Sequence, residues 1–292
     1  MLKSGFCAPL LLLIAALAGC NASSGLFSTP AANGGQPASY TTQWIQLVIF
    51  ENESYQEIIG NPEAPYITGL AANWANMTDS HAITHPSQPN YLALFSGSTQ
   101  GVTSDDCPVN FKAANLGSQL LKAGISFTGF AESMPHDGFQ GCQAHPDKLL
   151  SGWLYMRKHV PWTDFTNIPR KYNVVYRHAF SKPPSRFIWI TPNMCNDIHD
   201  CSVATGDKWA SKNLPKLIAW DQANGGVLIL TFDENDGTAG NQIPTILAGN
   251  VTPGQYPQDI NHYSVLRTIE DIFGVKPLGN AASATPIQGV IK

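Results

Sequence analysis

Short runs of apolar residues, each followed by a polar cluster, recur along the chain. The run WIQLVIF (residues 44–50) precedes ENESY, RFIWIT (186–191) precedes PNMCNDIHD, and GGVLILTF (225–232) precedes DENDG. Each run has the length and the β-branched and aromatic content of a strand that is buried on both faces, as in a parallel sheet. Two further runs, ISFTGFAE (125–132) and IPTILAG (243–249), predict additional strands.

Helical patterns separate these strands. Apolar spacing predicts helices over residues 92–95, after Ser87, and over residues 116–123, 209–223 and 263–273. This alternation favours a mostly parallel sheet that is covered by helices on both faces. Residues 152–172, rich in Trp, Tyr, Pro and basic side chains, do not fit the alternation. We interpret them as an irregular insertion over the sheet, whose one conceivable role is that of a lid.

The polar clusters are expected to share one edge of the sheet, because ligands in such folds bind beyond the carboxyl ends of the strands. Glu51 and Asn52 end the first run, and Asp233 and Glu234 end a later one. Carboxylate and amide oxygens suit a hard divalent cation. One such pair alone would be interpreted as a helix cap or a solvated turn, whereas two pairs on separate buried strands favour a metal site.

Ser87 stands between Pro86 and Pro89 in the stretch ITHPSQPNYLALFSG, residues 83–97. A hydroxyl at the start of a helix lies where backbone N–H groups and the helix dipole attract an anion such as phosphate. Metal coordination lowers the pKa of a hydroxyl, so Ser87 is a candidate both for nucleophile and for metal ligand. The alternative is an ordinary N-cap serine.

The cluster PNMCNDIHD contains a histidine, His199, that could transfer a proton or contact phosphate, and His262 in NHYSVL could do the same from another loop. The remaining histidines gain nothing from their spacing, although His85 is close to Ser87 in the sequence. The residues predicted to bind substrate are His85, Asn90, Asp197 and Asp200.

The first forty residues differ from the rest. Lys3 and the apolar run APLLLLIAALAGC are typical of a signal peptide over residues 1–19 and are too short for a stable membrane span. The run ends in LAGC, which resembles a bacterial lipobox and predicts lipidation of Cys20; cleavage nearby without lipidation is the alternative. If Cys20 is lipidated, Asn21 rather than Asp at the next position favours the outer membrane as the location of the protein. Residues 20–40 are interpreted as a flexible tether, and residues 41–292 as the folded domain.

Four cysteines remain in the domain: Cys107, Cys142, Cys195 and Cys201. In an exported chain an even number indicates disulfides, and three pairings are possible. We favour Cys107 with Cys142 and Cys195 with Cys201. Zinc binding is the alternative, but no C-x-x-C pair is present. The short second loop would be stabilised by only about 2 kcal/mol, so its bridge would mainly hold His199 in place.

The composition of the chain limits which molecules are expected to bind it. The 292 residues carry a formal net charge of −4, and 13% of them are charged. A chain with a pI of about 6.0 lacks the basic surface that nucleic-acid-binding proteins use, so nucleic acid is not expected as a partner. The low charge content and the many neutral polar residues agree with export, with a membrane contact only through the N-terminal lipid.

Five motifs in this order resemble the phosphoesterase family of bacterial and fungal acid phosphatases and phospholipases C, relatives of alkaline phosphatase: IFENESY, HPSQPNYLALFSG, ITPNMCNDIHD, LTFDENDG and NHYSVLRTIEDIFG. The similarity runs from about Ile45 to Gly274. It implies a three-layer α/β/α sandwich and hydrolysis through a phosphoseryl enzyme. By motif, Glu51 with Asn52 and Asp233 with Glu234 match the family's metal ligands and Ser87 its nucleophile. His199 and His262 match positions near the phosphate.

The resemblance therefore implies an exported, metal-dependent acid phosphatase that acts on small phosphomonoesters. One divalent metal ion is expected; the Asp and His sets that hold two zinc ions in alkaline phosphatases are missing from the motifs, which argues against a second. Phospholipase C or phosphodiesterase activity at the same site is the first alternative. A lipoprotein that binds a ligand without turnover is the second.

Overall fold

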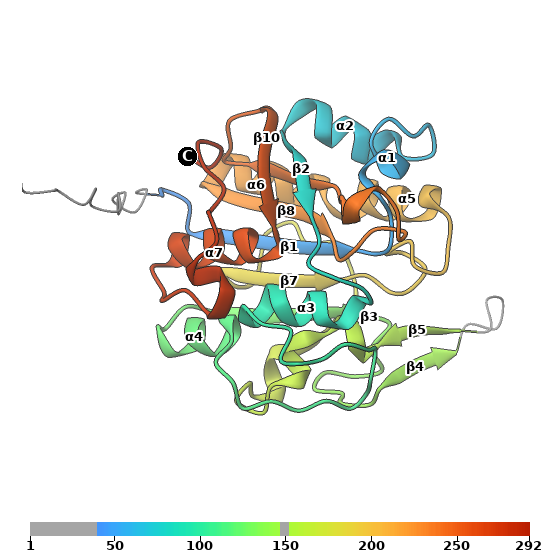
Figure 1. Ribbon diagram of the computed structural model, residues 1–292, viewed down its shortest axis with the longest axis vertical. Coiled ribbons are helices and arrows are strands. Elements are labelled where there is room, and N and C mark those ends of the chain that lie inside the picture. The colour runs from blue at the N-terminus through green and yellow to red at the C-terminus, as the bar shows by residue number, and fades with distance from the viewer. Residues whose placement is uncertain (1–39, 147–151) are drawn as a thin grey trace, which may run out of the picture. The chain divides into compact units, whose positions relative to one another are not determined.

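An eight-stranded mixed sheet forms the middle of the computed structural model, which describes residues 40–146 and 152–292 (Figure 1). Its strands in spatial order are β10 (Gly254–Asn261), β2 (Ala75–His81), β9 (Thr245–Gly249), β8 (Gly226–Phe232), β1 (Trp44–Phe50), β7 (Phe187–Thr191), β3 (Phe127–Glu132) and β6 (Asn173–Tyr176). All five predicted strands are present. Strand β9 is antiparallel to both of its neighbours, and the other pairings are parallel.

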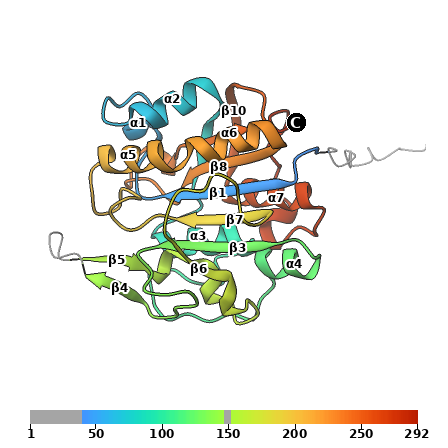
Figure 2. The same cartoon turned by 180° about the vertical axis from the view of Figure 1, so that it is seen from behind.

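Strand β1 shows why helices cover both faces. Alternate residues of a strand point to opposite faces, and Leu47 and Ile49 belong to one hydrophobic core while Val48 and Phe50 belong to the other. The first core is completed by α3 (Ser87–Ser96), α4 (Leu116–Lys122) and α7 (His262–Phe273). The second is completed by α1 (Tyr55–Ile58), α2 (Pro65–Asn73), α5 (Val203–Asn213) and α6 (Pro215–Asn224) (Figure 2). The predicted three-layer arrangement is confirmed.

Local sequence explains where the prediction of the elements was wrong. The single helix expected over residues 209–223 is two helices, because Pro215 has no N–H to continue α5 and instead begins α6. Strands β2 and β10 were not predicted. They are rich in polar residues, and β10, at the edge of the sheet, alternates between more and less exposed positions. An edge strand needs only one apolar face, so its apolar signal is weak.

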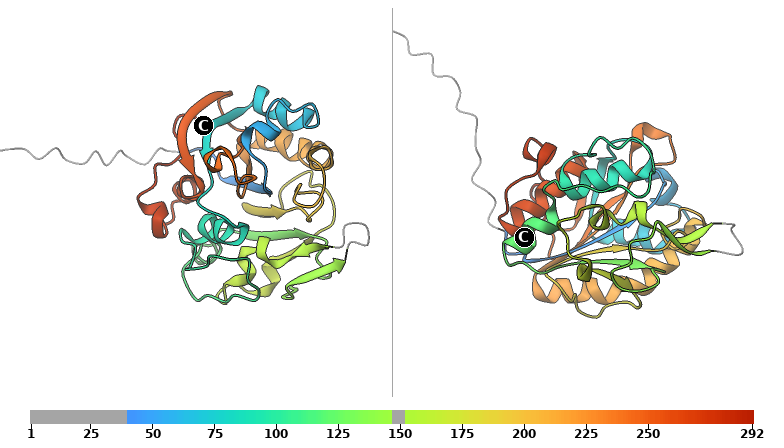
Figure 3. Two further views of the ribbon diagram at one scale, coloured as in Figure 1. Left: turned by 45° about the vertical axis from the view of Figure 1, so that its right-hand side comes forward. Right: turned by 90° about the horizontal axis from the view of Figure 1, so that it is seen from below.

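The order of the sheet brings the polar clusters together. Strands β7, β1 and β8 are adjacent and parallel, so the segments that follow them leave the same edge. The left view of Figure 3 turns this edge toward the viewer, and the right view separates α3 from α6 on opposite sides of the sheet. The backbone joins the segments directly, because Glu51 N–H donates to the carbonyl of Asp197 and Asp233 N–H donates to the carbonyl of Phe50.

Residues 152–172 form a fixed wall rather than a lid. They contain β5 (Trp153–Met156), which pairs with β4 (Gln143–Pro146), and the short 3-10 helices η1 (Arg157–His159), η2 (Pro161–Asp164) and η3 (Arg170–Tyr172). Trp162 is buried against Gly129 of β3 so closely that a Cβ on Gly129 would lie 2.2 Å from the indole ring. A segment packed in this way cannot open without exposing core. Two more 3-10 helices follow later, η4 (Ala239–Asn241) and η5 (Gly279–Ala282).

Two disulfides, Cys107–Cys142 and Cys195–Cys201, confirm the predicted pairing. The predicted signal peptide, Cys20 and the tether up to residue 39 lie outside the described residues. In the part of the chain that the structure describes, no helix has both the length and the apolar character needed to cross a membrane.

At the opposite end of the sheet from the polar clusters, Asp221 of α6 is fully buried beside Gln46 of β1. Both carboxylate oxygens of Asp221 have no hydrogen-bond partner among the described residues. Burial raises the pKa of Asp221 to about 8. The glycine at 226 makes room for this carboxyl, because a Cβ there would lie 2.1 Å from Asp221 Oδ1.

We expect Asp221→Asn to stabilise the protein increasingly as the pH rises. The folded state keeps the proton between about pH 4 and pH 8 while the unfolded chain releases it, so wild-type stability falls with rising pH in this window. The amide has no charge to bury, and its advantage at pH 8 should reach a few kcal/mol. Thermal unfolding at pH 4 to 8 measures this, with Asp259→Asn at an exposed position as control. A constant difference between wild type and Asp221→Asn would contradict the prediction.

Candidate active site

Ser87 is the first residue of α3 and its hydroxyl points into a cluster of acids. Ser87 Oγ lies 3.1 Å from Glu51 Oε2 and 3.1 Å from Glu234 Oε1, and only 2% of the residue is exposed. The N-cap position belongs to Pro86, whose side chain makes no capping hydrogen bond. The hydroxyl is therefore directed to the two carboxylates and does not act as a cap. The nucleophile candidate and the two predicted acidic pairs do converge.

Asn90 fixes the segment that precedes Ser87. Its Oδ1 accepts hydrogen bonds from the N–H groups of Ile83 and Thr84 at 3.0 and 3.1 Å, and its amide group donates to the carbonyls of Thr84 and Pro86 at 2.8 and 3.2 Å. These four bonds use the full hydrogen-bonding capacity of an asparagine side chain. Asn90 thus positions the start of α3. The sequence predicts that Asn90 binds substrate, but its side chain has no free hydrogen-bonding group with which to do so.

Glu51 is the centre of the site and is fully buried. The hydroxyl of Tyr91, one turn after Ser87 on α3, donates to Glu51 Oε1, and His159 Nε2 lies 3.2 Å from the same oxygen. The rings of Tyr91 and His159 stack with their centroids 5.0 Å apart. Three elements, β1, α3 and η1, therefore hold one carboxylate.

The second acidic pair is held from both sides. Asn52, with φ of 56°, turns its N–H toward Asp233 Oδ1 at 3.2 Å. His262 Nε2 lies 2.6 Å from the backbone carbonyl of Asp233, so this buried histidine supports the end of β8. His85 Nδ1 lies 2.6 Å from Glu234 Oε2 and is the more exposed partner. His262, one of the two histidines predicted to transfer a proton, thus lies behind Asp233 and contacts the backbone of Asp233, not Ser87.

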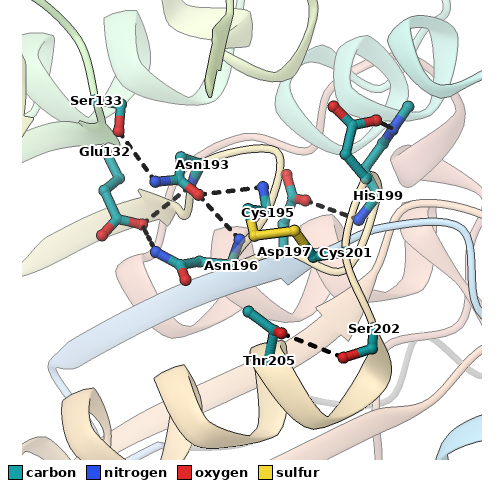
Figure 4. The surroundings of a disulfide bond; sticks show 11 residues. Glu132, Ser133, Asn193, Cys195, Asn196, Asp197, His199, Cys201, Ser202 and Thr205 are labelled. Atoms are coloured by element: carbon teal, nitrogen blue, oxygen red, sulfur yellow. Dashed lines mark hydrogen bonds and ion pairs between the residues drawn. A yellow bond between two sulfur atoms is a disulfide. The ribbon is translucent and has the colours of Figure 1, made fainter. Parts of the chain in front are cut away.

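Hydrogen bonds within the disulfide loop and to Glu132 hold its shape (Figure 4). Asn193 accepts the N–H groups of Cys195 and Asn196 at 3.1 and 2.9 Å, which closes the turn together with the Cys195–Cys201 bridge. Asp197 is fully buried; its Oδ1 accepts the N–H of His199 at 2.9 Å.

His199 is oriented by the residue that follows it. Its Nδ1 lies 2.8 Å from Asp200 Oδ1, and its Nε2 lies 3.4 Å from Lys158 Nζ. Because an ammonium can only donate, this arrangement makes Nε2 the acceptor and gives Nδ1 the proton. Asp200 therefore orients the imidazole ring of His199.

Buried negative charge dominates the electrostatics of the site. Desolvation, followed by repulsion from Asp233 and Asp197, raises the pKa of Glu51 well above its ordinary value. Desolvation also raises the pKa of Asp197 well above its usual range. It raises the pKa of Asp233 and of Glu234 to about 7 each, with Glu234 adding to the effect on Asp233. A bound cation would relieve this repulsion and favour the charged carboxylates.

The donor atoms fit a metal ion. Asp233 Oδ2 and Asp197 Oδ2 are buried and have no hydrogen-bond partner among the described residues. Glu51, His159 and His199 each offer a ligand atom within 4.8 Å of the others'. Desolvation, with the charge of Lys158, lowers the pKa of His159 well below its ordinary value, which leaves its nitrogens free of the extra proton. Glu51 thus belongs both to the predicted acidic set and to this histidine-containing set.

Sequence reasoning missed three contributors. Tyr91 could have been found, because it lies four residues after Ser87 on a predicted helix and so shares its face. Lys158 and His159 carried no such signal, since they lie in an irregular segment far from every motif. Only the packing of η1 against α3 brings them to Glu51.

The chain is similar to proteins of known activity. The model of the phosphoesterase family matches residues 60–276. A phosphatidylinositol-3-phosphatase of Mycobacterium tuberculosis is 42% identical over 287 residues, which cover 96% of this chain and 93% of that protein. A probable acid phosphatase of Kluyveromyces lactis is 31% identical over 80% of this chain and 58% of its own length.

Solved structures show the same fold at low identity. A protein of the alkaline phosphatase superfamily from Vibrio parahaemolyticus matches with a TM-score of 0.55 and 13% identity over 82% of this chain and 68% of that one. The lipoteichoic acid synthase LtaP of Listeria monocytogenes matches with a TM-score of 0.57 and 11% identity over 87% and 77%. The fold is therefore that of the alkaline phosphatase superfamily, and the chain belongs to the phosphoesterase family and is a phosphoric ester hydrolase.

Proposed function

We propose that this protein is an exported, metal-dependent phosphatase that hydrolyses phosphomonoesters through a phosphoserine on Ser87. The observation that carries the proposal is the position of the Ser87 hydroxyl, buried and shared between Glu51 and Glu234 at the start of α3. Export rests on the signal-peptide pattern of residues 1–19 and on the lipobox at Cys20.

Glu51, Asp233 and Glu234 would hold the ion, and Ser87 Oγ and the Asn52 side chain would complete its ligands. A second set of ligand atoms, on His159 and His199, shares Glu51 with this one. When bound, a divalent ion supplies positive charge that favours the serine alkoxide and polarises phosphoryl oxygens. Glu51 is itself kept in place by Tyr91 and His159.

The reaction would proceed in two displacements. Ser87 Oγ forms a bond to phosphorus, the ester oxygen leaves, and the serine proton passes to a neighbouring carboxylate such as Glu234. Water then attacks the phosphoserine and the Oγ–P bond breaks. His199 Nε2 gives up its contact with Lys158 and takes the proton of that water, while the carboxylate returns the serine proton to Ser87 Oγ. We assign His262, Asp200 and Asn90 to positioning, because each holds a residue or segment of the site.

The main question about the substrate is whether its phosphorus carries one ester bond or two. The acid phosphatase and the phosphatidylinositol-3-phosphatase among the relatives both act, by their names, on phosphomonoesters. We therefore propose monoesters, including a phosphorylated inositol headgroup, before phosphodiesters. Initial rates on p-nitrophenyl phosphate, its bis ester, phosphatidylinositol 3-phosphate and phosphatidylcholine would rank these classes.

Replacing Ser87 by alanine should lower kcat by at least about a thousandfold, because alanine has no oxygen with which to attack phosphorus. Rapid quenching of the wild type followed by mass spectrometry should find phosphate on the peptide that contains Ser87. The fold should persist, since only one oxygen is removed. Wild-type turnover by Ser87→Ala would remove this residue from the mechanism.

Chelation should abolish activity and lower the melting temperature, and re-addition of a divalent ion should restore both, because the ion binds only the folded carboxylate cluster. Metal content of the purified protein gives the identity and number of ions. Asp233→Asn and His159→Asn separate the two ligand sets, since loss of a ligand should weaken binding at least about tenfold. Full activity after complete metal removal would refute metal dependence.

Removing the bridge with Cys195→Ser and Cys201→Ser together should reduce kcat more than stability. The bridge closes a sequence separation of only six residues, which corresponds to about 2 kcal/mol of chain entropy. The loop carries Asp197 and His199, so its loosening misplaces them. Kinetics and thermal unfolding of the same sample test this. A drop in melting temperature with unchanged kcat would show that the bridge has no part in positioning.

A further inference from the structure

Lys158 of η1 is a buried cation at the edge of the active site. Only 8% of the residue is exposed, which is unusual for lysine because removing an ammonium from water is costly. Its Nζ lies 2.8 Å from Asp105 Oδ2 and 3.4 Å from His199 Nε2. It follows in sequence a second buried cation, Arg157, whose guanidinium is satisfied by Asp164 and by the backbone carbonyls of Gln140, Val109 and Thr163. Lys158 is therefore the cation of this pair that faces the site.

Asp105 connects Lys158 to the nucleophile. One oxygen of its carboxylate binds the ammonium, and the other accepts the N–H of Gln88 at 3.0 Å. Gln88 is the residue after Ser87. The carboxylate of Asp105 therefore bridges the ammonium of Lys158 and the backbone at the start of α3. The Cys107–Cys142 bridge anchors the loop that carries Asp105. Lys158 is thus held in place by a partner that is itself fixed.

The ammonium faces the charges that surround Ser87. Its neighbour His199, 3.4 Å away, offers a ligand atom within 4.8 Å of one on Glu51, which itself accepts from Ser87. An ammonium has three N–H donors. One donates to Asp105, and a second points to Nε2 of His199. The third has no hydrogen-bond partner among the described residues and can serve an anion.

We infer that Lys158 binds a non-bridging oxygen of the substrate's phosphoryl group and selects doubly charged monoesters over singly charged diesters, with Asp105 as its positioning residue. This inference rests on the proposed phosphatase function and names the residue that sets its substrate class. A diester carries one negative charge less and replaces one charged oxygen by an esterified one. Such a substrate gains less from a fixed cation on the side of the phosphoryl group.

The test compares Lys158→Met with wild type on p-nitrophenyl phosphate and on the bis ester, with inorganic phosphate as inhibitor. A hydrogen bond to a charged group corresponds to a factor of about ten to one hundred. The monoester kcat/KM should fall by that factor, the diester value should change by less than about threefold, and the inhibition constant of phosphate should rise at least about tenfold. Lys158→Gln, which can still donate to Asp105 but has no charge, should show the same pattern.

Lys216→Met removes an exposed lysine of α6 and should match wild type in all three measurements. An equal loss on monoester and diester, with phosphate inhibition unchanged, would overturn the inference and leave Lys158 a structural residue. If the wild type itself hydrolyses neither ester and does not bind phosphate, the proposed function fails instead. The two failures are therefore distinguishable in one set of assays.

Discussion

The site depends on buried negative charge that the fold gathers without neutralising it. Glu51, Asp197 and Asp233 come from the ends of different strands, and each is almost completely buried. Like charges in a region of low dielectric raise one another's pKa and oppose folding unless a cation or proton compensates them. The same arrangement gives a metal ion its ligands, and it keeps the Ser87 hydroxyl between acceptors that aim it toward an incoming phosphorus.

Around this centre, most of the other polar residues position something else. Asn90 holds the backbone that leads into α3, His262 supports the end of β8, and Asp200 orients the ring of His199. Such support is what preorganised chemistry requires, because groups that must reorganise during the reaction contribute less to its rate. The number of residues that touch the reacting atoms is consequently smaller than the number of polar residues in the motifs.

The ammonium of Lys158 reaches the site from η1, which also supplies His159. This segment is held by the packing of Trp162 against β3 and by the contact of Arg157 with Asp164. The carboxylates and the cation thus come from separate parts of the fold: strand ends supply the first, and a wall beside the sheet supplies the second. In the proposed mechanism the carboxylates would hold a metal ion, and a phosphoryl group with two negative charges is complementary to that ion and to the ammonium.

The sequence by itself determined five strands, the two-faced core and the acidic pairs, because buried parallel strands are marked by unbroken apolar runs and their ends by sudden polarity. It also favoured the observed cysteine pairing among three and placed Ser87 at the start of a helix. Tertiary structure alone decided that Lys158 and His159 join the site, that Asn90 is fully occupied by backbone groups, and that His262 stands behind Asp233. These outcomes depend on which surfaces pack together across large sequence separations. Residue type and local spacing do not predict this packing.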